Sequence, residues 1–199
     1  MASASDGNHG LLLVISGPSG VGKTTITRAL ERNLGGTFSV SVTTRPRAEG
    51  EVEGRDYYFL SDIEFQQRAD DGAFLEHAKV YGEYRYGTPR EPVERQVAEG
   101  KLVILDIDVQ GARQVKQTMP EAFTLFILPP SEEELLRRLR KRRREDEASI
   151  QRRFDEAKRE IAFAEGSGVY DAHIVNEDLD RAIDDASCLI NHQRTMNVG

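Results

Sequence analysis

The chain has 199 residues, the size of one domain or of one domain with an inserted lobe. Its formal net charge is −7, which argues against general nucleic-acid binding and against attachment to an anionic membrane. No stretch approaches the roughly 20 apolar residues of a transmembrane helix, and the single cysteine, Cys188, excludes an internal disulfide. We therefore expect a globular protein of the reducing cytoplasm, with no membrane or nucleic-acid partner.

The first third of the chain begins with a polar segment and then changes pattern. Residues 1–10 are small and polar, and we expect a disordered lead. Residues 11–16 are an apolar run, typical of a central parallel strand, that ends in a glycine-rich turn. Residues 23–34 then place apolar side chains four apart, as in a helix. This order of strand, glycine turn and helix predicts an α/β fold.

The segment 41–90 differs in character and predicts an inserted α+β lobe. A helix is expected over 61–71, because Ser61 and Glu64 have the spacing of a capping box. Aromatic and glycine-rich stretches on either side indicate short strands. These strands are expected at 38–44, at 57–60 and within 74–90.

The rest of the chain alternates strands with helices, which predicts a parallel sheet covered on both faces. Ser131 and Glu134 form another capping-box pattern, which opens a very basic helix, and a charged stretch at 141–147 interrupts it. The expected strands are 102–106, 123–128 and 173–175, and the later helices are 149–165 and 179–191.

Residues 17–24, GPSGVGKT, fit the phosphate-loop pattern G-x-x-x-x-G-K-[ST] in full. The glycines let backbone N–H groups turn toward a phosphate, and the helix that follows adds its positive end. Lys23 can reach the β- and γ-phosphates, and the Thr24 hydroxyl can bind Mg²⁺. The sequence thus predicts a nucleoside-triphosphate site made of Gly17, Pro18, Ser19, Gly20, Val21, Gly22, Lys23, Thr24 and Thr25.

Asp106 lies at the end of a predicted apolar strand. An acidic residue at this place in phosphate-loop proteins can hold Mg²⁺, directly or through water. The alternative is that Asp106 merely ends the strand at a turn. The phosphate loop upstream favours the metal role.

Five motifs, in order, resemble the guanylate kinase family. They are GPSGVGKTT, SVTTRPRAEGEVEGRDYYF, FLEHAKVYGEYRYGTPR, ILDIDVQGA and IVNEDLD, and the resemblance runs from about residue 11 to 190. It implies an α/β phosphate-loop NTPase core with a parallel sheet flanked by helices, a small GMP-binding lobe and a helical lid. The core would comprise 11–40, 91–133 and 165–199, the lobe 41–90 and the lid about 134–164. The implied reaction of purine metabolism is ATP + GMP → ADP + GDP, with Mg²⁺ as cofactor.

The resemblance also assigns residues to GMP. A monophosphate dianion needs fixed donors, and arginine and tyrosine side chains supply them. The family pattern places Ser41, Arg45, Tyr57 and Tyr86 on the GMP phosphate, and Arg47 is a further candidate. Here Pro46 follows Arg45 directly, so Arg47 comes one position earlier than is usual. Tyr84 is the alternative to Tyr86.

Guanine presents two donors, N1–H and N2–H₂, on one edge, and one carboxylate can accept from both. The family pattern places Glu76 there, with Asp108 nearby and Thr88 donating to O6. Adenine has a lone pair at N1 and would meet Glu76 acceptor against acceptor. A site built for such hydrogen bonds rejects a mismatched ligand by about 10⁴–10⁵.

The basic helix allows three interpretations. It can be a solvated, ion-paired face or a nucleic-acid patch, which the net charge disfavours. The third is a catalytic lid, for which the resemblance singles out Arg138, Arg142 and Arg153. Arginines around the transferring group stabilise its charge. The resemblance also places Asn176 beside the adenine of ATP. The alternative, that Asn176 is only a turn residue that follows a strand, is equally consistent with the sequence.

Two other functions stay open on the residues alone. A guanylate-kinase-like scaffold that binds protein partners typically has a degraded phosphate loop, whereas Lys23 and Thr24 are both present here. A phosphate-loop kinase with another acceptor is disfavoured by Glu76 and Asp108. The sequence does not decide whether dGMP is used, nor between a monomer and a homodimer.

Overall fold

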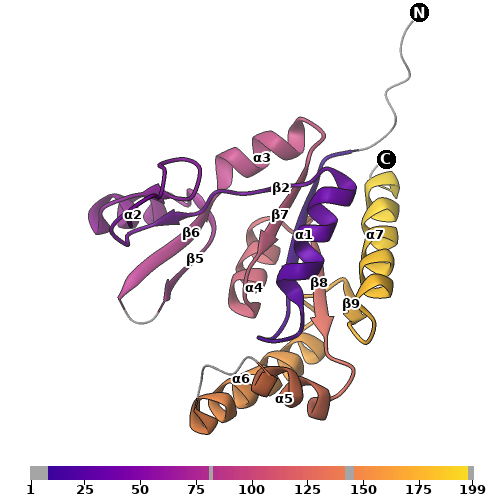
Figure 1. Ribbon diagram of the computed structural model, residues 1–199. Helices are drawn as coiled ribbons and strands as arrows, with labels where there is room; N and C mark the ends of the chain where they lie inside the picture. Colours follow the sequence, from indigo (N-terminus) through magenta and orange to yellow (C-terminus); the bar gives the residue numbers. More distant parts are fainter. Residues whose placement is uncertain (1–8, 81–82, 142–145, 197–199) are drawn as a thin grey trace, which may run out of the picture.

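Two β-sheets of different size organise the chain (Figure 1). The computed structural model describes residues 9–80, 83–141 and 146–196. The larger sheet is wholly parallel and confirms the predicted α/β class. In spatial order its strands are β2 (Thr37–Phe38), β7 (Leu102–Asp106), β1 (Leu11–Ser16), β8 (Phe123–Leu128) and β9 (Ala172–Val175).

The central strand β1 is buried along its whole length, because helices cover both faces of the sheet. Leu11, Leu13 and Ile15 pack into a cluster with the helices of one face, whereas Leu12 and Val14 join the cluster of the other. This alternation follows from the period of two along a strand. The first face carries α1 (Lys23–Leu34) and α7 (Leu179–Met196), and the second carries α3 (Arg90–Ala98) and α4 (Val109–Thr118).

The smaller sheet lies to one side of the larger one (Figure 1). Its order is β4 (Tyr58–Phe59), β3 (Val42–Thr43), β6 (Tyr84–Pro89) and β5 (Phe74–Val80), and α2 (Asp62–Asp70) packs on it by stacking Phe65 on Phe74. α4 fastens this sheet to the core. The Gln114 amide exchanges two hydrogen bonds with the backbone of His77, and Thr118 Oγ1 donates to the Leu75 carbonyl (2.9 Å).

The predicted strand over 38–44 is wrong, because the chain changes sheets within it. β2 pairs with β7 in the larger sheet, whereas β3 pairs with β4 and β6 in the smaller one. Alternating side chains in sequence cannot reveal such a crossing, since each half fits a strand equally well. The crossing carries the chain from the core to the smaller sheet.

Two helices, α5 (Glu132–Lys141) and α6 (Glu147–Gly166), extend from the core past the ends of β1 and β8 (Figure 1). They share a small apolar cluster made of Leu135, Leu139, Ile150, Phe154 and Ala157. None of the helices in the described ranges has the length and apolar content of a membrane span.

The two predicted capping boxes have different outcomes. At α2 the box is complete: Glu64 N–H donates to Ser61 Oγ (3.2 Å) and Ser61 N–H donates to Glu64 Oε2 (2.9 Å). At α5 only Ser131 caps, accepting from Glu134 N–H (3.2 Å). The Glu134 carboxylate turns to Arg137 and Arg138 instead. A charged neighbour thus outcompetes the backbone for this carboxylate.

The last helix, α7, runs to Met196, five residues beyond the predicted end at 191. Arg194 in this extension is 6% exposed. Its Nε donates to the carbonyl of His9 and its Nη2 to that of Gly100, both at 3.1 Å. One buried guanidinium therefore joins the end of α7, the segment before β1 and the turn before β7.

Replacing Arg194 by methionine leaves the His9 and Gly100 carbonyls without these donors. We expect Arg194→Met to lower the free energy of unfolding by about 1–3 kcal/mol, the cost of buried unsatisfied polar groups. Urea denaturation followed by circular dichroism measures the change. The matched control is Arg181→Met on the same helix, where the side chain is 83% exposed. Equal stability of the two variants would contradict the role of Arg194.

Candidate functional site

The phosphate loop forms an open cavity of about 300 Å³ at the carboxyl end of β1. Gly20 and Gly22 adopt φ values of +88° and +98°, which favour glycine and turn the backbone around the cavity. Gly22 is the N-cap of α1 and no side chain caps the helix, so no capping side chain competes with an anion for its first turn. All eight motif residues except Val21 line the cavity, together with Thr25, Asp108 and Glu160.

Asn176, in the turn after β9, supports this loop from behind. It is 5% exposed, and its Nδ2 donates to the Val21 carbonyl at 2.7 Å. A Cβ on Gly22 would lie 2.4 Å from the same Nδ2. The close approach explains why glycine is required at position 22 in addition to its φ. The adenine contact expected for Asn176 stays a prediction.

Arg138 connects α5 to the loop. Its Nε donates to Glu134 Oε1 (2.7 Å), its Nη2 to the carbonyl of Asn176 (3.0 Å) and its Nη1 to the carbonyl of Val21 (3.4 Å). The hydrogen bonds from Arg137 and Arg138 lower the pKa of Glu134 to about 2. Arg138 is thus held at the phosphate loop by acceptors of the protein itself.

The other two predicted lid arginines have different positions. Arg153, on α6, donates from Nη2 to Ser19 Oγ of the phosphate loop. Arg142 lies outside the described residues. The structure therefore brings Arg138 and Arg153 to the phosphate loop from two separate helices.

Asp106 meets the phosphate loop through the sheet register. Because β1 and β7 are parallel and Ile15 lies opposite Asp106, the two strands end at the same edge. Lys23 Nζ pairs with Asp106 Oδ1 at 2.7 Å, with both side chains partly exposed. The Thr24 side chain is exposed at the same cavity. An ammonium group, a carboxylate and a hydroxyl therefore lie close together at the site predicted for a triphosphate.

Asp108 has a structural task at the same edge. Its Oδ1 accepts from the N–H groups of Gln110 and Gly111 at 2.9 and 2.8 Å and so caps α4. This holds the carboxylate at the border of the cavity, facing Glu160 from α6. Sequence reasoning missed Glu160, because a lone glutamate on a charged helix carries no signal.

Glu76 lies on β5 with its carboxylate almost buried. It is 9% exposed, and its Oε1 accepts from Thr88 Oγ1 at 2.6 Å across the β5–β6 pair. Burial raises the pKa of Glu76, the Thr88 hydrogen bond opposes this, and the charge of Asp108 adds to it. The structure therefore brings together the three residues predicted to read guanine.

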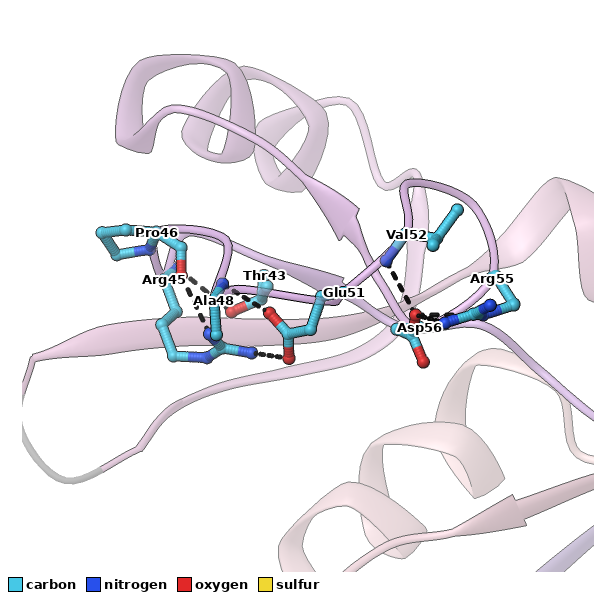
Figure 2. A network of polar contacts seen from close by, with 8 residues as sticks. All are labelled: Thr43, Arg45, Pro46, Ala48, Glu51, Val52, Arg55 and Asp56. Atoms are coloured by element: carbon cyan, nitrogen blue, oxygen red, sulfur yellow. Dashed lines mark hydrogen bonds and ion pairs between the residues drawn. The ribbon is translucent and has the colours of Figure 1, made fainter.

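Arg45 is the centre of a polar network in the loop after β3 (Figure 2). Its Nη2 donates to Glu51 Oε1 (2.6 Å) and its Nη1 to the Pro46 carbonyl (2.8 Å). Glu51 Oε2 in turn accepts from Ala48 N–H (2.8 Å), which closes the loop. The hydrogen bond to Glu51 raises the pKa of Arg45, with a smaller contribution from Tyr86. Sequence reasoning missed Glu51, although its place six residues after Arg45 was visible.

The two predicted tyrosines gather at this arginine. The Arg45 guanidinium lies 5.4 Å from the centre of the Tyr57 ring, and the rings of Tyr57 and Tyr86 meet edge to face at 6.0 Å. Tyr84 hydrogen-bonds to Glu83, which raises the pKa of Tyr84. Arg47 lies exposed on the loop. The contacts to Arg45 thus favour Tyr86 over Tyr84.

A second cavity, of about 240 Å³, lies between the two sheets. Ser41, Tyr57 and Thr88 line it from the smaller sheet, and Asp106 lines it from β7. Asp106 and Asp108 are two residues apart and border one cavity each. The end of β7 therefore lies between the phosphate-loop cavity and a cavity bordered by Ser41, Tyr57 and Thr88.

Comparisons with known proteins agree with this geometry. The family model described as guanylate kinase matches residues 9–193. Proteins named guanylate kinase from Clostridium tetani and Symbiobacterium thermophilum are 46% and 48% identical, covering 93% and 95% of this chain and 87% and 88% of their own. A crystal structure of guanylate kinase from Anaplasma phagocytophilum is similar with a TM-score of 0.67 and 38% identity, over 94% of this chain and 87% of that one.

The close approach of Gly22 and Asn176 generates a prediction. A methyl group at position 22 must displace the Asn176 amide and strain the backbone, so Gly22→Ala should cost about 1–3 kcal/mol of stability. The displaced loop should bind ADP about tenfold more weakly. Calorimetric titration with ADP and thermal melting measure both effects. Gly166→Ala is the control, because nothing lies within 4 Å of its Cβ. Unchanged ADP affinity in Gly22→Ala would refute the argument.

Proposed function

Because this chain belongs to the guanylate kinase family and phosphorylates GMP with ATP, we propose that its two cavities divide the substrates between them. The observation that carries the proposal is the end of β7, where Asp106 borders the second cavity and Asp108 borders the phosphate-loop cavity. ATP would occupy the phosphate loop and GMP the cavity between the sheets. The reacting phosphates would then meet at this strand end.

The ATP phosphates would lie in the loop formed by residues 17–25. Backbone N–H groups at Gly20 and Gly22 and the positive end of α1 would hold the oxygens. Lys23 would exchange part of its pairing with Asp106 for the β- and γ-phosphates. Asn176 would hold this loop in shape from behind and lie near the adenine.

The GMP phosphate would bind among the polar groups of the smaller sheet. Arg45 offers its guanidinium, and Tyr57, Tyr86 and Ser41 add neutral hydroxyls. Arg47 is exposed on the same loop, and a small loop shift would bring it to the phosphate. Arginine already fixed by Glu51 loses little entropy on binding a phosphate.

Glu76 would read the guanine. Its carboxylate can accept from N1–H and N2–H₂, and Thr88 would exchange its hydrogen bond to Glu76 for one to O6. Asp108 adds negative charge nearby, which favours the donor edge of guanine. Adenine has a lone pair at N1 and would meet the Glu76 carboxylate acceptor against acceptor.

The residues present fit a magnesium ion. Mg²⁺ prefers oxygen ligands and is commonly held by one or two carboxylates together with substrate phosphates. Thr24 supplies a hydroxyl in the phosphate-loop cavity, and Asp106, which pairs with Lys23 at the end of β7, supplies a carboxylate that can act through water. Across the described residues, no group of three or more acidic, histidine or cysteine side chains forms a complete site. When bound, the ion neutralises charge on the transferring phosphoryl group.

Transfer of the phosphoryl group requires that the reacting groups are aligned and that positive charge surrounds them. An oxygen of the GMP phosphate attacks the γ-phosphorus of ATP, the bond to the β–γ bridging oxygen breaks, and its electron pair leaves with ADP. Arg138 and Arg153 already lie at the phosphate loop and would surround the transferring group, joined by Arg142. α5 and α6 would act as a lid that also excludes water.

We further propose a cytoplasmic location, because ATP and GMP are the substrates and the lone Cys188 is exposed as a free thiol. Use of dGMP is compatible with a reader that contacts only the base and the phosphate. Neither inference depends on the oligomeric state.

Acceptor choice tests the role of Glu76. ADP release should occur with GMP and not with AMP, CMP or UMP. Glu76→Gln should lower kcat/KM for GMP about 10–150-fold, since a hydrogen bond to a charged group is lost, and leave the affinity for ATP unchanged. Glu121→Gln, at an exposed position, is the control. Equal losses for GMP and ATP would make the assignment of the guanine reader wrong.

Lys23→Ala tests the phosphate loop. Loss of the one loop side chain that carries a positive charge should lower kcat about 10²–10³-fold, as for other groups that stabilise transition-state charge. The melting temperature should stay near that of the native protein, because Lys23 is partly exposed. Lys101→Ala, which removes an exposed lysine paired with Glu99, should retain full activity. Substantial turnover in Lys23→Ala would contradict the role proposed for Lys23 at the ATP phosphates.

A further inference from the structure

Glu160 borders the phosphate-loop cavity from α6, and the proposed mechanism gives it no role. The residue lies on α6 and is partly buried. Thr24 and Asp108 border the same cavity of about 300 Å³. A carboxylate in a cavity for phosphates requires an explanation, because both groups are hydrogen-bond acceptors and both are negative.

The charges around Glu160 are arranged against its ionised form. Burial raises the pKa of Glu160 to about 7, Glu156 and Asp108 contribute to the rise, and Lys23 opposes it. Burial raises the pKa of Tyr170, and the negative charge of Glu160 adds to this rise. A carboxylate in this position is stabilised by a cation placed beside it.

The position of Glu160 on α6 gives the second argument. Arg153 and Glu160 are seven residues apart, two helical turns, and therefore share one face of the helix. Arg153 reaches Ser19 near the start of the phosphate loop, and Glu160 interacts electrostatically with Lys23 near its end. The same helix face thus presents a cation to one part of a bound nucleotide and an anion to another.

α6 is also placed so that a contact at Glu160 would set its position. Ile161, the next residue, packs against both the cluster shared by α5 and α6 and the cluster on one face of the large sheet. Glu160 therefore lies where α6 joins the core. An interaction at this point holds the helix, and Arg153 with it, at the loop.

We propose that Glu160 is a positioning residue that makes the phosphate loop prefer the magnesium-bound nucleotide over the free nucleotide. The inference rests on the magnesium assignment of the proposed function. Water bound to the ion would donate to Glu160, whereas bare phosphate oxygens would be repelled by it. Arg153 would contact the phosphates from the same helix, so α6 would be held most firmly on the loop when nucleotide and metal are both present.

The test is the affinity of the enzyme for ADP, measured by titration calorimetry once with excess Mg²⁺ and once with EDTA. The native protein should bind ADP more tightly with Mg²⁺. In Glu160→Gln the ratio of the two affinities should fall about tenfold, as free ADP gains and the magnesium complex loses. Glu160→Asp should restore part of the preference. Glu165→Gln, the same change at an exposed position of α6, should leave the ratio unchanged.

The outcomes separate this inference from the assignment on which it rests. A native preference for the magnesium complex that survives undiminished in Glu160→Gln overturns the role of Glu160 and leaves the magnesium site in place. Absence of any preference in the native protein overturns both. Because an affinity ratio within one variant cancels a general loss of binding, a merely structural effect of the substitution would leave it unchanged. Glu160→Ala provides a second variant if Glu160→Gln fails to fold.

Discussion

The parallel pairing of β1 with β7 is the constraint on which the site depends. It sets Ile15 opposite Asp106, so the glycine loop that leaves β1 and the acidic residues that leave β7 meet at one edge of the sheet. A slip of one residue would turn Asp106 to the other face and break its 2.7 Å pairing with Lys23. Fully buried side chains on both faces of β1 make that slip expensive.

Three of the cations expected to meet a phosphate are already paired with carboxylates within the protein. Asp106 holds Lys23, Glu51 holds Arg45, and Glu134 with two carbonyl oxygens holds Arg138. These acceptors orient the cations before a substrate arrives, which reduces the reorganisation needed on binding. They also explain how an acidic chain with a net charge of −7 can have local sites for anions.

Features carried by short sequence signals could be predicted, and features that depend on distant partners could not. The glycine spacing of residues 17–24 and the apolar runs of β1, β7 and β8 are local, so the phosphate loop and the α/β class followed from them. The family resemblance added the residues around Glu76 and Arg45. It could not show that Asn176 fills the space beside Gly22, because those positions are 154 residues apart in the numbering.

The same limit applies to the wrong expectations. Residues 38–44 alternate as one strand would, and only their partners in two different sheets divide them. Glu134 has the spacing of a capping residue, but Arg137 and Arg138 one turn later compete for its carboxylate. The end of α7 was placed too early because the burial of Arg194 depends on His9 and Gly100, far away in sequence.

The hydrogen bond from Arg194 to the His9 carbonyl holds the start of the described chain beside its end (Figure 1). The hydrogen bonds of the large sheet join strands that are not consecutive along the chain, such as β1 and β7. The sheet therefore does not require the present order of its strands in the sequence. A short linker could therefore join the two ends, and the chain could be opened at an exposed turn such as Gly72. Such a circular permutant would keep both cavities while changing which segment leaves the ribosome first.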